Sequence, residues 1–450
     1  MNKIILLGMR SDPNLGDALI AECTEKLTAD ACAELGIRDI SLVHVDVRGL
    51  DYREHHRAEQ KRMREEAAAR EKARIEAELN PPPKTAKEKF WEAFPALKRL
   101  YGRIFRERIA AQRAEKERLR VEAAERKKQQ RLDDMVSYAR KAAFSSIDND
   151  TVAVIVVGGG MIKYKHQHLP LLLEPFVERA DELDVPVMFN SVGVEGYDGT
   201  DDECRTLCDI LARPCVKTVT TRDDIDTLGK YYVNPNTVHT ALTPDPVCAV
   251  TRLYGEERKN SEVIGLGVVR GKLFEDHGVN VSHEQLMEVW KNVIGLLEQS
   301  GKPWRLFSNG LDADREFGEQ LLESIGRADK ADELMLPQPE RPEQLVEMIR
   351  GFGGIISCRL HSAIIAHEYG VPAVEPVWNE KQRFFGEQAG MSGCFIELSD
   401  NSADSAALLV SRLEAEQIAA PVRRRLDASA TYDEIKRFIN DHIVNRVVSE

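Results

Sequence analysis

Short, fully apolar segments alternate along this chain with longer segments whose apolar residues recur at helical spacing. Lys3–Leu7 is one such apolar segment and predicts a buried strand, whereas residues 17–35 carry apolar side chains about every three or four positions and predict a helix. Further strands are expected at 40–47, 152–157, 185–192, 216–220, 262–269, 304–308, 354–357 and 371–377. Strands that alternate with helices in this way build parallel βαβ units, so the pattern predicts an α/β protein with doubly wound sheets.

A hinge divides this alternation into two sets. Thr243–Pro246 combines turn formers, the charged stretch 256–261 follows it, and strands and helices then alternate again. We therefore predict two Rossmann-like lobes: an N-terminal lobe from residues 1–50 and 144–250, and a C-terminal lobe from 251–450 that ends in a long helix. Ligands of such sheets bind beyond the carboxyl ends of the strands, so a site is expected in the loops there.

Residues 51–143 interrupt the first lobe with a different composition. Ala, Glu, Lys, Arg and Gln dominate this insertion, which predicts helices, and Pro81–Pro83 divides it into two arms that resemble an αα-hairpin or a coiled coil. Between Arg53 and Leu132 there are 24 Lys and Arg residues against 14 Asp and Glu, a net charge of +10, whereas the whole chain carries −13. The rest of the chain must then carry −23, which argues against a nucleic-acid partner.

The middle of the insertion, residues 84–108, has an amphipathic pattern. Its apolar residues recur at spacings of three and four among many Lys and Arg residues; they are Phe90, Trp91, Phe94, Leu97, Leu100, Tyr101, Ile104 and Phe105. This stripe either packs on the protein or on a partner subunit, which would support a homo-oligomer, or lies on an anionic membrane surface. Pro95 is expected to kink a helix in either case.

The sequence contains no evident targeting or membrane-spanning segment. Only four apolar residues in a row precede Gly8, too few for a signal-peptide core, and no segment approaches the roughly 18 apolar residues of a membrane span. The eight cysteines are scattered without metal-ligand spacing, so reduced thiols and no metal site are expected. These features predict a cytoplasmic protein, with peripheral contact at the inner face of a membrane through 84–108 as the open alternative.

Four strand ends carry residues suited to chemistry, and two of these are rich in glycine. Asn14 or Asp17 could cap the helix after the first strand and Gly16 could supply a positive φ, or the three could hold sugar hydroxyls. Gly158–Gly160 ends a later strand and lets backbone amides approach a ligand, although it lacks the spaced Gly-x-Gly-x-x-Gly pattern. A tight strand–helix turn is the ordinary explanation for these three glycines.

The other two strand ends bring cations. Arg222 either pairs with a nearby carboxylate such as Asp224 or Asp226, or presents its guanidinium to a carboxylate or phosphate of a ligand. Arg359-Leu360-His361 runs from a buried strand into a helix, whose N-terminus favours anions, and Lys381 follows the next strand. This histidine can exchange protons near neutral pH, or it is a buried structural residue. We predict that the reacting centre lies around these residues.

Several of these motifs occur in the order seen in the polysaccharide pyruvyl transferases, and the sequence resembles that family over about residues 1–47 and 152–390. The motifs are Asn14-x-Gly16-Asp17, Val157–Gly160, Arg222, Asp245-Pro246, Arg359–Ala363, Gly370–Pro372 and Lys381. The Arg-Leu-His segment with a lysine about twenty residues later is the most specific of them. The charged insertion lies outside the resemblance, and its size is a departure from the family.

The resemblance implies a fold similar to the B-type glycosyltransferases. It also implies an enzyme that moves a pyruvyl group from phosphoenolpyruvate onto a sugar of a cell-surface or extracellular polysaccharide precursor, as a ketal, and releases phosphate. Phosphoenolpyruvate would be a co-substrate, with no further cofactor and no metal. In this interpretation the catalytic residues are His361 and Arg359, and the donor is bound by Arg222, Arg359, His361 and Lys381. The acceptor sugar would face Asn14, Gly16, Asp17, Gly159 and Gly160.

Two other functions stay open on the sequence alone. A nucleotide-sugar glycosyltransferase would share the architecture, and the acidic residues Glu375 and Glu380 are compatible with it. A non-catalytic scaffold would instead use the basic insertion to dock biosynthetic enzymes at a membrane. The scaffold predicts that alanine at Arg359, His361 or Lys381 leaves biological activity intact.

Overall fold

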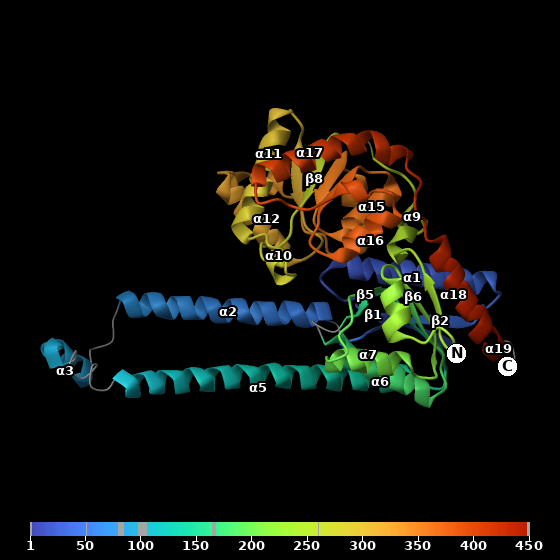
Figure 1. Ribbon diagram of the computed structural model, residues 1–450, viewed down its shortest axis with the longest axis horizontal. Helices are drawn as coiled ribbons and strands as arrows, with labels where there is room; N and C mark the ends of the chain where they lie inside the picture. Colours follow the sequence, from blue (N-terminus) through green and yellow to red (C-terminus); the bar gives the residue numbers. More distant parts are fainter. Residues whose placement is uncertain are drawn as a thin grey trace. The chain divides into compact units, whose positions relative to one another are not determined.

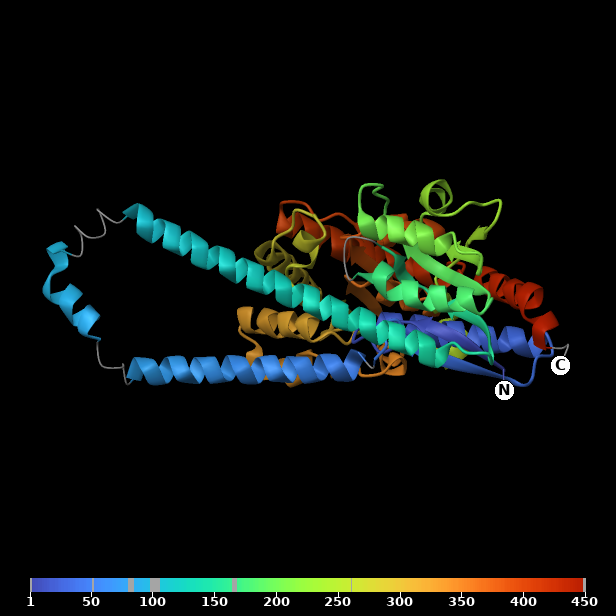
Figure 2. The ribbon, with the colours of Figure 1, turned by 90° about the horizontal axis from the view of Figure 1, so that it is seen from below.

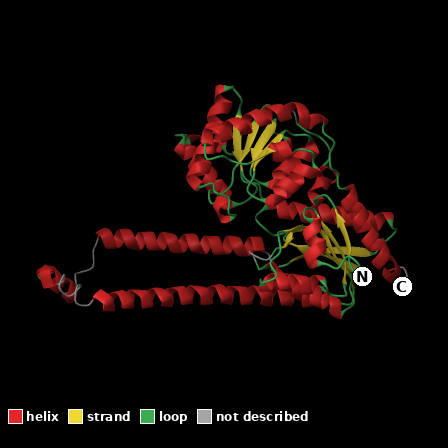
Figure 3. Cartoon of the chain, viewed as in Figure 1, coloured by secondary structure: helices red, strands yellow, loops and turns green. Residues whose placement is uncertain are grey.

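The computed structural model describes residues 2–50, 52–79, 85–97, 106–163, 168–259 and 261–447. Its contacts divide the chain into two units, one made of Met1–Gly49 and Ala139–Glu450 and the other of Leu50–Tyr138. The first unit contains two separate parallel sheets, each flanked by helices (Figure 3). One cluster of buried apolar side chains runs through both lobes of this unit.

The N-terminal sheet has seven parallel strands in the order β2-β1-β3-β5-β6-β7, with β4 paired to β5. These strands are β1 Asn2–Gly8, β2 Ile40–Asp46, β3 Thr151–Val156, β4 Gly159–Ile162, β5 Val187–Val194, β6 Val216–Thr221 and β7 His239–Leu242. The strand order reverses between β1 and β3, and doubly wound sheets bind ligands at such a switch point. The loops that leave these two strands carry Asn14–Asp17 and Gly158–Gly160.

The helices that pack around the N-terminal sheet include one from each end of the chain, α1 Leu15–Glu34 and α18 Ser429–His442. The others are α6 Leu169–Glu182, α7 Asp202–Leu211 and α8 Ile225–Thr227, and α18 is followed by α19 Val444–Val447. α18 lies beside α1, where Tyr432 and Lys436 both contact Glu34 (Figures 1 and 2). The sequence alone assigned all of 251–450 to the second lobe, whereas this last helix makes its contacts with the first.

The C-terminal sheet has five parallel strands in the order β12-β11-β10-β8-β9, and its switch point lies between β8 and β10. The strands are β8 Ile264–Gly267, β9 Trp304–Phe307, β10 Gly354–Ser357, β11 Ala373–Pro376 and β12 Phe395–Ile396. The helices of this lobe are α9 Val250–Tyr254, α10 Leu273–Asp276, α11 His283–Gln299, α12 Asp312–Ser324, α13 Ala331–Leu334, α14 Pro342–Arg350, α15 Leu360–Tyr369, α16 Glu380–Gln388 and α17 Ser402–Ala419. α15 starts directly after β10, so its N-terminus lies at the switch point.

The second unit consists of helices: α2 Tyr52–Leu79, α3 Ala86–Ala93 and the first part of α5 Arg106–Ser146. All side chains of α2 that the structure describes are exposed, as expected for helices covered with alternating charges. α3 ends two residues before Pro95, because proline disfavours helical backbone in the residue that precedes it. Pro81–Pro83, the expected turn between the arms, and residues 98–105 of the amphipathic stretch lie outside the described residues.

No helix within the described ranges combines the length and the apolar composition needed to cross a bilayer. The eight cysteines are unpaired thiols, and all except Cys208 are buried.

Candidate functional site

Loops at the switch points of both sheets surround a cavity of about 280 Å³, which we call the reaction cavity. Seven residues singled out from the sequence line it: Asn14, Asp17, Gly160, Arg222, Arg359, His361 and Lys381. The two remaining predicted site residues lie nearby: Gly16 lies against the ring of His361, and Gly159 lies beside the carboxylate of Asp17. Residues from both lobes therefore meet in one place.

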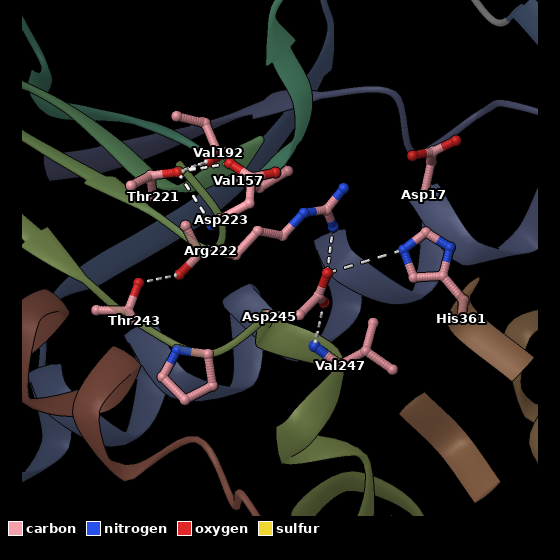
Figure 4. Close-up of polar contacts among 12 residues, drawn as sticks. Asp17, Val157, Val192, Thr221, Arg222, Asp223, Thr243, Asp245, Val247 and His361 are labelled. Atoms are coloured by element: carbon pink, nitrogen blue, oxygen red, sulfur yellow. Dashed lines mark hydrogen bonds and ion pairs between the residues drawn. The ribbon is translucent and has the colours of Figure 1, made fainter. Parts of the chain in front are cut away.

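His361 stands in the first turn of α15 and enters the reaction cavity as a neutral ring. Its side chain is nearly buried, and its Nε2 lies 3.9 Å from Oδ2 of Asp245 (Figure 4). Among the described groups, none forms a hydrogen bond with this nitrogen. Burial lowers the pKa of His361 to about 3; Asp245 opposes this shift, and nearby cations such as Arg222 add to it.

Gly16 makes room for that imidazole. A Cβ built on Gly16 would lie 2.0 Å from Nδ1 of His361, closer than real atoms approach, so any side chain here would displace the ring. Gly16 is part of α1 and does not have a positive φ, so the backbone explanation offered by the sequence is wrong. The glycine is required instead because a helix of one lobe meets a histidine of the other.

Asn14 and Asp17 form a pair on the other side of the cavity. Asn14 occupies the N-cap position of α1, yet its side chain makes no capping hydrogen bond. Its Nδ2 instead donates to Oδ2 of Asp17 at 2.8 Å. Burial and the neighbouring Asp12 raise the pKa of Asp17 to about 6, although Lys381 and other cations oppose the shift. Asp17 can therefore accept or release a proton close to neutral pH.

The three glycines lie where the chain passes from β3 into β4, and they allow the backbone to turn in a confined space. Gly158 and Gly159 have φ values of +109° and +84°, which side chains rarely tolerate. A Cβ on Gly158 would lie 2.9 Å from Ile20 of α1. The expected strand–helix turn is wrong, because a second strand follows and places Gly160 at the cavity.

Arg222 is paired within its own lobe. Its Nη1 donates to Asp245, a residue that also accepts the Val247 N–H at 2.9 Å (Figure 4). The partner is thus neither Asp224 nor Asp226, the two carboxylates that are close in sequence. Burial opposes the charge of Arg222, but Asp245, Asp223 and Asp17 together outweigh burial and raise the pKa of the guanidinium.

The guanidinium of Arg359 is restrained by two hydrogen bonds to one carboxylate. Its Nε and Nη2 donate to the two carboxylate oxygens of Asp314 in α12, at 3.0 and 2.8 Å. Asp314 is fully buried and also accepts the Arg270 N–H at 2.9 Å. This bidentate pair fixes the guanidinium plane, so Arg359 offers a ligand only its remaining N–H groups.

Lys381 contributes a cation to the reaction cavity. Its backbone N–H donates to the N-cap residue Asn379 at 3.0 Å, which places the side chain in the first turn of α16. Nζ lies 5.2 Å from the centroid of the Trp378 ring. No described carboxylate forms an ion pair with this ammonium; burial lowers its pKa, and Glu195 opposes the shift from a greater distance.

Sequence reasoning missed several residues that complete the cavity. Lys163 follows β4, Glu195 follows β5 and Arg270 follows β8; the first two form an ion pair of 3.5 Å. All three stand at carboxyl ends of strands, so the rule that located the other residues would have found them. Asp314 has no such signal, because α12 looks in the sequence like an ordinary charged helix.

Comparisons with known proteins identify the family and the fold. A model of the polysaccharide pyruvyl transferase family matches residues 14–380. The UDP-GlcNAc 2-epimerase of Methanocaldococcus jannaschii has a similar structure, with a TM-score of 0.53 and 11% identity over 98% of this chain and 100% of that one. The UDP-GlcNAc 2-epimerase of Neisseria meningitidis, solved with UDP-GlcNAc, is similar at a TM-score of 0.53 and 12% identity over the same shares. No curated protein matches in sequence.

At such low identity, these structures concern the fold alone. They confirm the expected α/β architecture of two Rossmann-like lobes that resembles the B-type glycosyltransferases.

Proposed function

Since the chain belongs to the polysaccharide pyruvyl transferase family, we propose that it moves a pyruvyl group from phosphoenolpyruvate onto a sugar. The sugar would be part of a cell-surface or extracellular polysaccharide precursor. Two of its hydroxyls would join the same carbon as a ketal, and phosphate would leave.

The observation that carries this proposal is that Lys381 and His361 line the same small cavity. Phosphoenolpyruvate is a small, multiply charged anion, and Lys381 is a cation there that no described carboxylate neutralises. The N-termini of α15 and α16 add the positive ends of two helix dipoles. Arg222 and Arg359, although paired, still direct positive charge at the same space.

The chemistry requires three proton movements. The methylene carbon of phosphoenolpyruvate gains one proton and becomes the methyl group of the ketal. Both sugar hydroxyls lose a proton as their oxygens bond to the adjacent carbon, and the bond from that carbon to the phosphate oxygen breaks. One of the two released protons balances the one gained by the methylene carbon, and the other leaves with phosphate.

Two groups in the reaction cavity suit these steps. His361 would protonate the methylene carbon or bind the leaving phosphate through its open Nε2. Asp17, with a pKa of about 6, would take the proton of an attacking hydroxyl, since a base works best near the pH at which it titrates. Closure of the two lobes would exclude water and align donor and acceptor.

The test is phosphate release from phosphoenolpyruvate by the purified protein, with and without a panel of sugar acceptors. We expect His361→Ala to lower acceptor-dependent release by about 10²-fold or more, as for loss of a general acid or base. Lys381→Ala should weaken phosphoenolpyruvate binding, measured by calorimetry. His55→Ala, at an exposed histidine of α2, serves as the matched control.

The same samples decide between the alternatives. Phosphoenolpyruvate that fails to bind, together with tight binding of UDP-GlcNAc, would replace this proposal with a nucleotide-sugar glycosyltransferase. Phosphate release that persists in both His361→Ala and Lys381→Ala would contradict the assigned roles.

A further inference from the structure

A second, larger cavity of about 760 Å³ adjoins the reaction cavity. Four residues line both of them: Glu195, His277, Trp378 and Lys381. The larger cavity has the size of a typical ligand site, and it shares these four residues with the cavity in which the transferred group would form. We call it the adjoining cavity.

The lining of the adjoining cavity combines apolar surface with carboxylates. Apolar side chains come from Val194, Val279, Val377, Phe384 and Leu398. The carboxylates are those of Glu195, Asp223, Asp224, Glu380 and Glu397. Apolar patches with a few placed hydrogen-bond acceptors suit a sugar, which has C–H faces and hydroxyl donors.

The two cations that line the adjoining cavity are not available to bind an anionic group there. Arg383 is already bound by two carboxylates, since its Nε donates to Glu380 at 3.3 Å and its Nη2 contacts Glu397. Lys381 is the other cation among the lining residues, and it stands at the boundary where the proposed donor binds. A phosphate or carboxylate in the adjoining cavity would therefore face like charges, which is costly.

We propose that the adjoining cavity is the acceptor subsite and that it takes an uncharged sugar, whose reacting hydroxyls reach the reaction cavity beside Glu195. This inference rests on the proposed function. Any charged carrier of the sugar lies outside this cavity. Glu195 accepts a hydrogen bond from one sugar hydroxyl and so positions it.

Glu195 has the location and the charge for that task. Its side chain is partly exposed, and a Cβ on Gly160 would lie 3.1 Å from its Oε1, so the carboxylate stands directly over the glycine loop. Burial opposes its ionisation, but Lys381 and Lys163 outweigh burial and hold the pKa of the carboxyl below its ordinary value. An ionised carboxylate binds a hydroxyl donor more strongly than a neutral group does.

One variant narrows the adjoining cavity at a residue that does not line the reaction cavity. Val279 lines the adjoining cavity and is absent from the lining of the other. Val279→Trp should raise the KM for the acceptor about tenfold or more and leave the Kd for phosphoenolpyruvate unchanged. Val422→Trp is the matched control, because Val422 is 84% exposed and outside both cavities.

A second variant tests the positioning role. Glu195→Gln should raise the acceptor KM about 10- to 100-fold, as for the loss of a hydrogen bond to a charged group. Phosphoenolpyruvate should bind no more weakly, because a negative charge beside Lys381 has been removed. The matched control is Glu414→Gln, which also removes a carboxylate from an ion pair with a lysine, Lys302, at 2.8 Å.

The charge preference is tested with pairs of ligands that carry the same hydroxyls. Methyl glycosides of glucose, galactose, mannose and their N-acetylated amino sugars are compared with the UDP-linked sugars by saturation-transfer NMR. We expect at least one methyl glycoside to bind the wild-type protein no more weakly than its UDP-linked counterpart, and Val279→Trp to abolish that binding.

The outcomes separate the two proposals. If phosphoenolpyruvate itself does not bind, the proposed function fails. If it binds, but no methyl glycoside does, or the UDP-linked sugars bind more than tenfold tighter, or Val279→Trp binds glycosides normally, the acceptor subsite is overturned while the proposed function stands.

Discussion

Gly16 packs against the proposed catalytic histidine of the other lobe, so a change at this position affects both the contact between the lobes and the proposed chemistry. An alanine methyl at this position would overlap the ring of His361. We expect Gly16→Ala to lower kcat about 10²-fold, because small displacements of a catalytic group have effects of this size. The melting temperature should change little, since alanine favours the helix that contains position 16 while the displaced ring disfavours it.

A matched glycine separates these two effects. Gly295 lies in the middle of α11, and a Cβ there would meet no atom within 4 Å. Gly295→Ala should therefore raise the free energy of unfolding by up to about 1 kcal/mol and leave kcat unchanged. Full activity in Gly16→Ala would show that the ring of His361 can move without consequence.

His361 is expected to gain a proton when phosphoenolpyruvate binds. Its pKa is about 3 in the empty cavity, and an anion next to Nε2 favours the imidazolium and raises that value. The complex then holds one proton more than the free protein does, so affinity must fall as pH rises. The fall begins above about pH 3 and ends where pH passes the pKa of His361 in the complex.

Calorimetry in two buffers of different ionisation enthalpy measures this uptake directly at pH 7. The wild type should take up as much as one proton more than His361→Gln, whose uptake reports the titration of the remaining groups, including phosphoenolpyruvate and Asp17. Equal uptake in both proteins would place the proton elsewhere.

The side chains of the site were predictable from the sequence to different degrees. Those at strand ends, such as Arg222 and Lys381, stand out because a charge after an apolar run is conspicuous. Their partners do not: Asp245 lies 23 positions beyond Arg222, and Asp314 lies 45 positions before Arg359. The sequence therefore suggested only nearby carboxylates as partners for Arg222 and none for Arg359, whereas the folded chain restrains both guanidinium groups with distant carboxylates. Tertiary pairing of this kind has no local pattern.

At the scale of elements, apolar periodicity located the long strands and the amphipathic helices to within a few residues. β1, predicted at Lys3–Leu7, spans Asn2–Gly8, and α1, predicted at 17–35, spans Leu15–Glu34. β4, β7 and β12 were missed. β4 begins inside the glycine motif, β7 is partly exposed, and β12 has two residues. Such strands contain too few consecutive apolar residues to stand out in the sequence.

α3 and the residues that follow it carry the apolar side chains whose partner the sequence left open. Phe90, Phe94 and Leu97 are each nearly half exposed, and the two phenylalanine rings lie 5.2 Å apart. If they bind an anionic membrane, Trp91→Ser combined with Phe94→Ser should weaken binding to phosphatidylserine vesicles about tenfold or more. Added salt should weaken wild-type binding as well.

Equally exposed residues on the neighbouring helices provide the control for that experiment. Ile75 of α2 and Leu119 of α5 are 46% and 49% exposed, and serine at both should leave vesicle binding intact. Unchanged partitioning of the Trp91 and Phe94 variant would exclude the membrane. A lower mass of that variant in solution, measured by light scattering, would instead identify a partner subunit as the surface that covers α3.

At the scale of the whole molecule, contacts at the reaction cavity hold the two lobes together. The Leu15 N–H donates to the Asn309 carbonyl at 3.0 Å, and the Gln388 amide donates to the Arg222 carbonyl at 2.7 Å. α18 returns from the C-terminal lobe and packs on α1. Each lobe therefore restrains residues of the other, which is how His361 can depend on a glycine more than 300 positions away.

Every described residue that lines either cavity belongs to the first unit. Replacing residues 53–132 by a flexible linker should leave the Kd for phosphoenolpyruvate and the kcat with a small methyl glycoside within about threefold of the wild type. Alanine at Arg359, His361 or Lys381 should abolish the same turnover. A scaffold predicts the reverse in a cellular assay of polysaccharide synthesis, because the deletion would remove its docking surface and the three alanine variants would retain it. Measuring turnover and cellular activity on these four proteins therefore separates an enzyme that carries an accessory helical unit from a non-catalytic scaffold that acts through that unit.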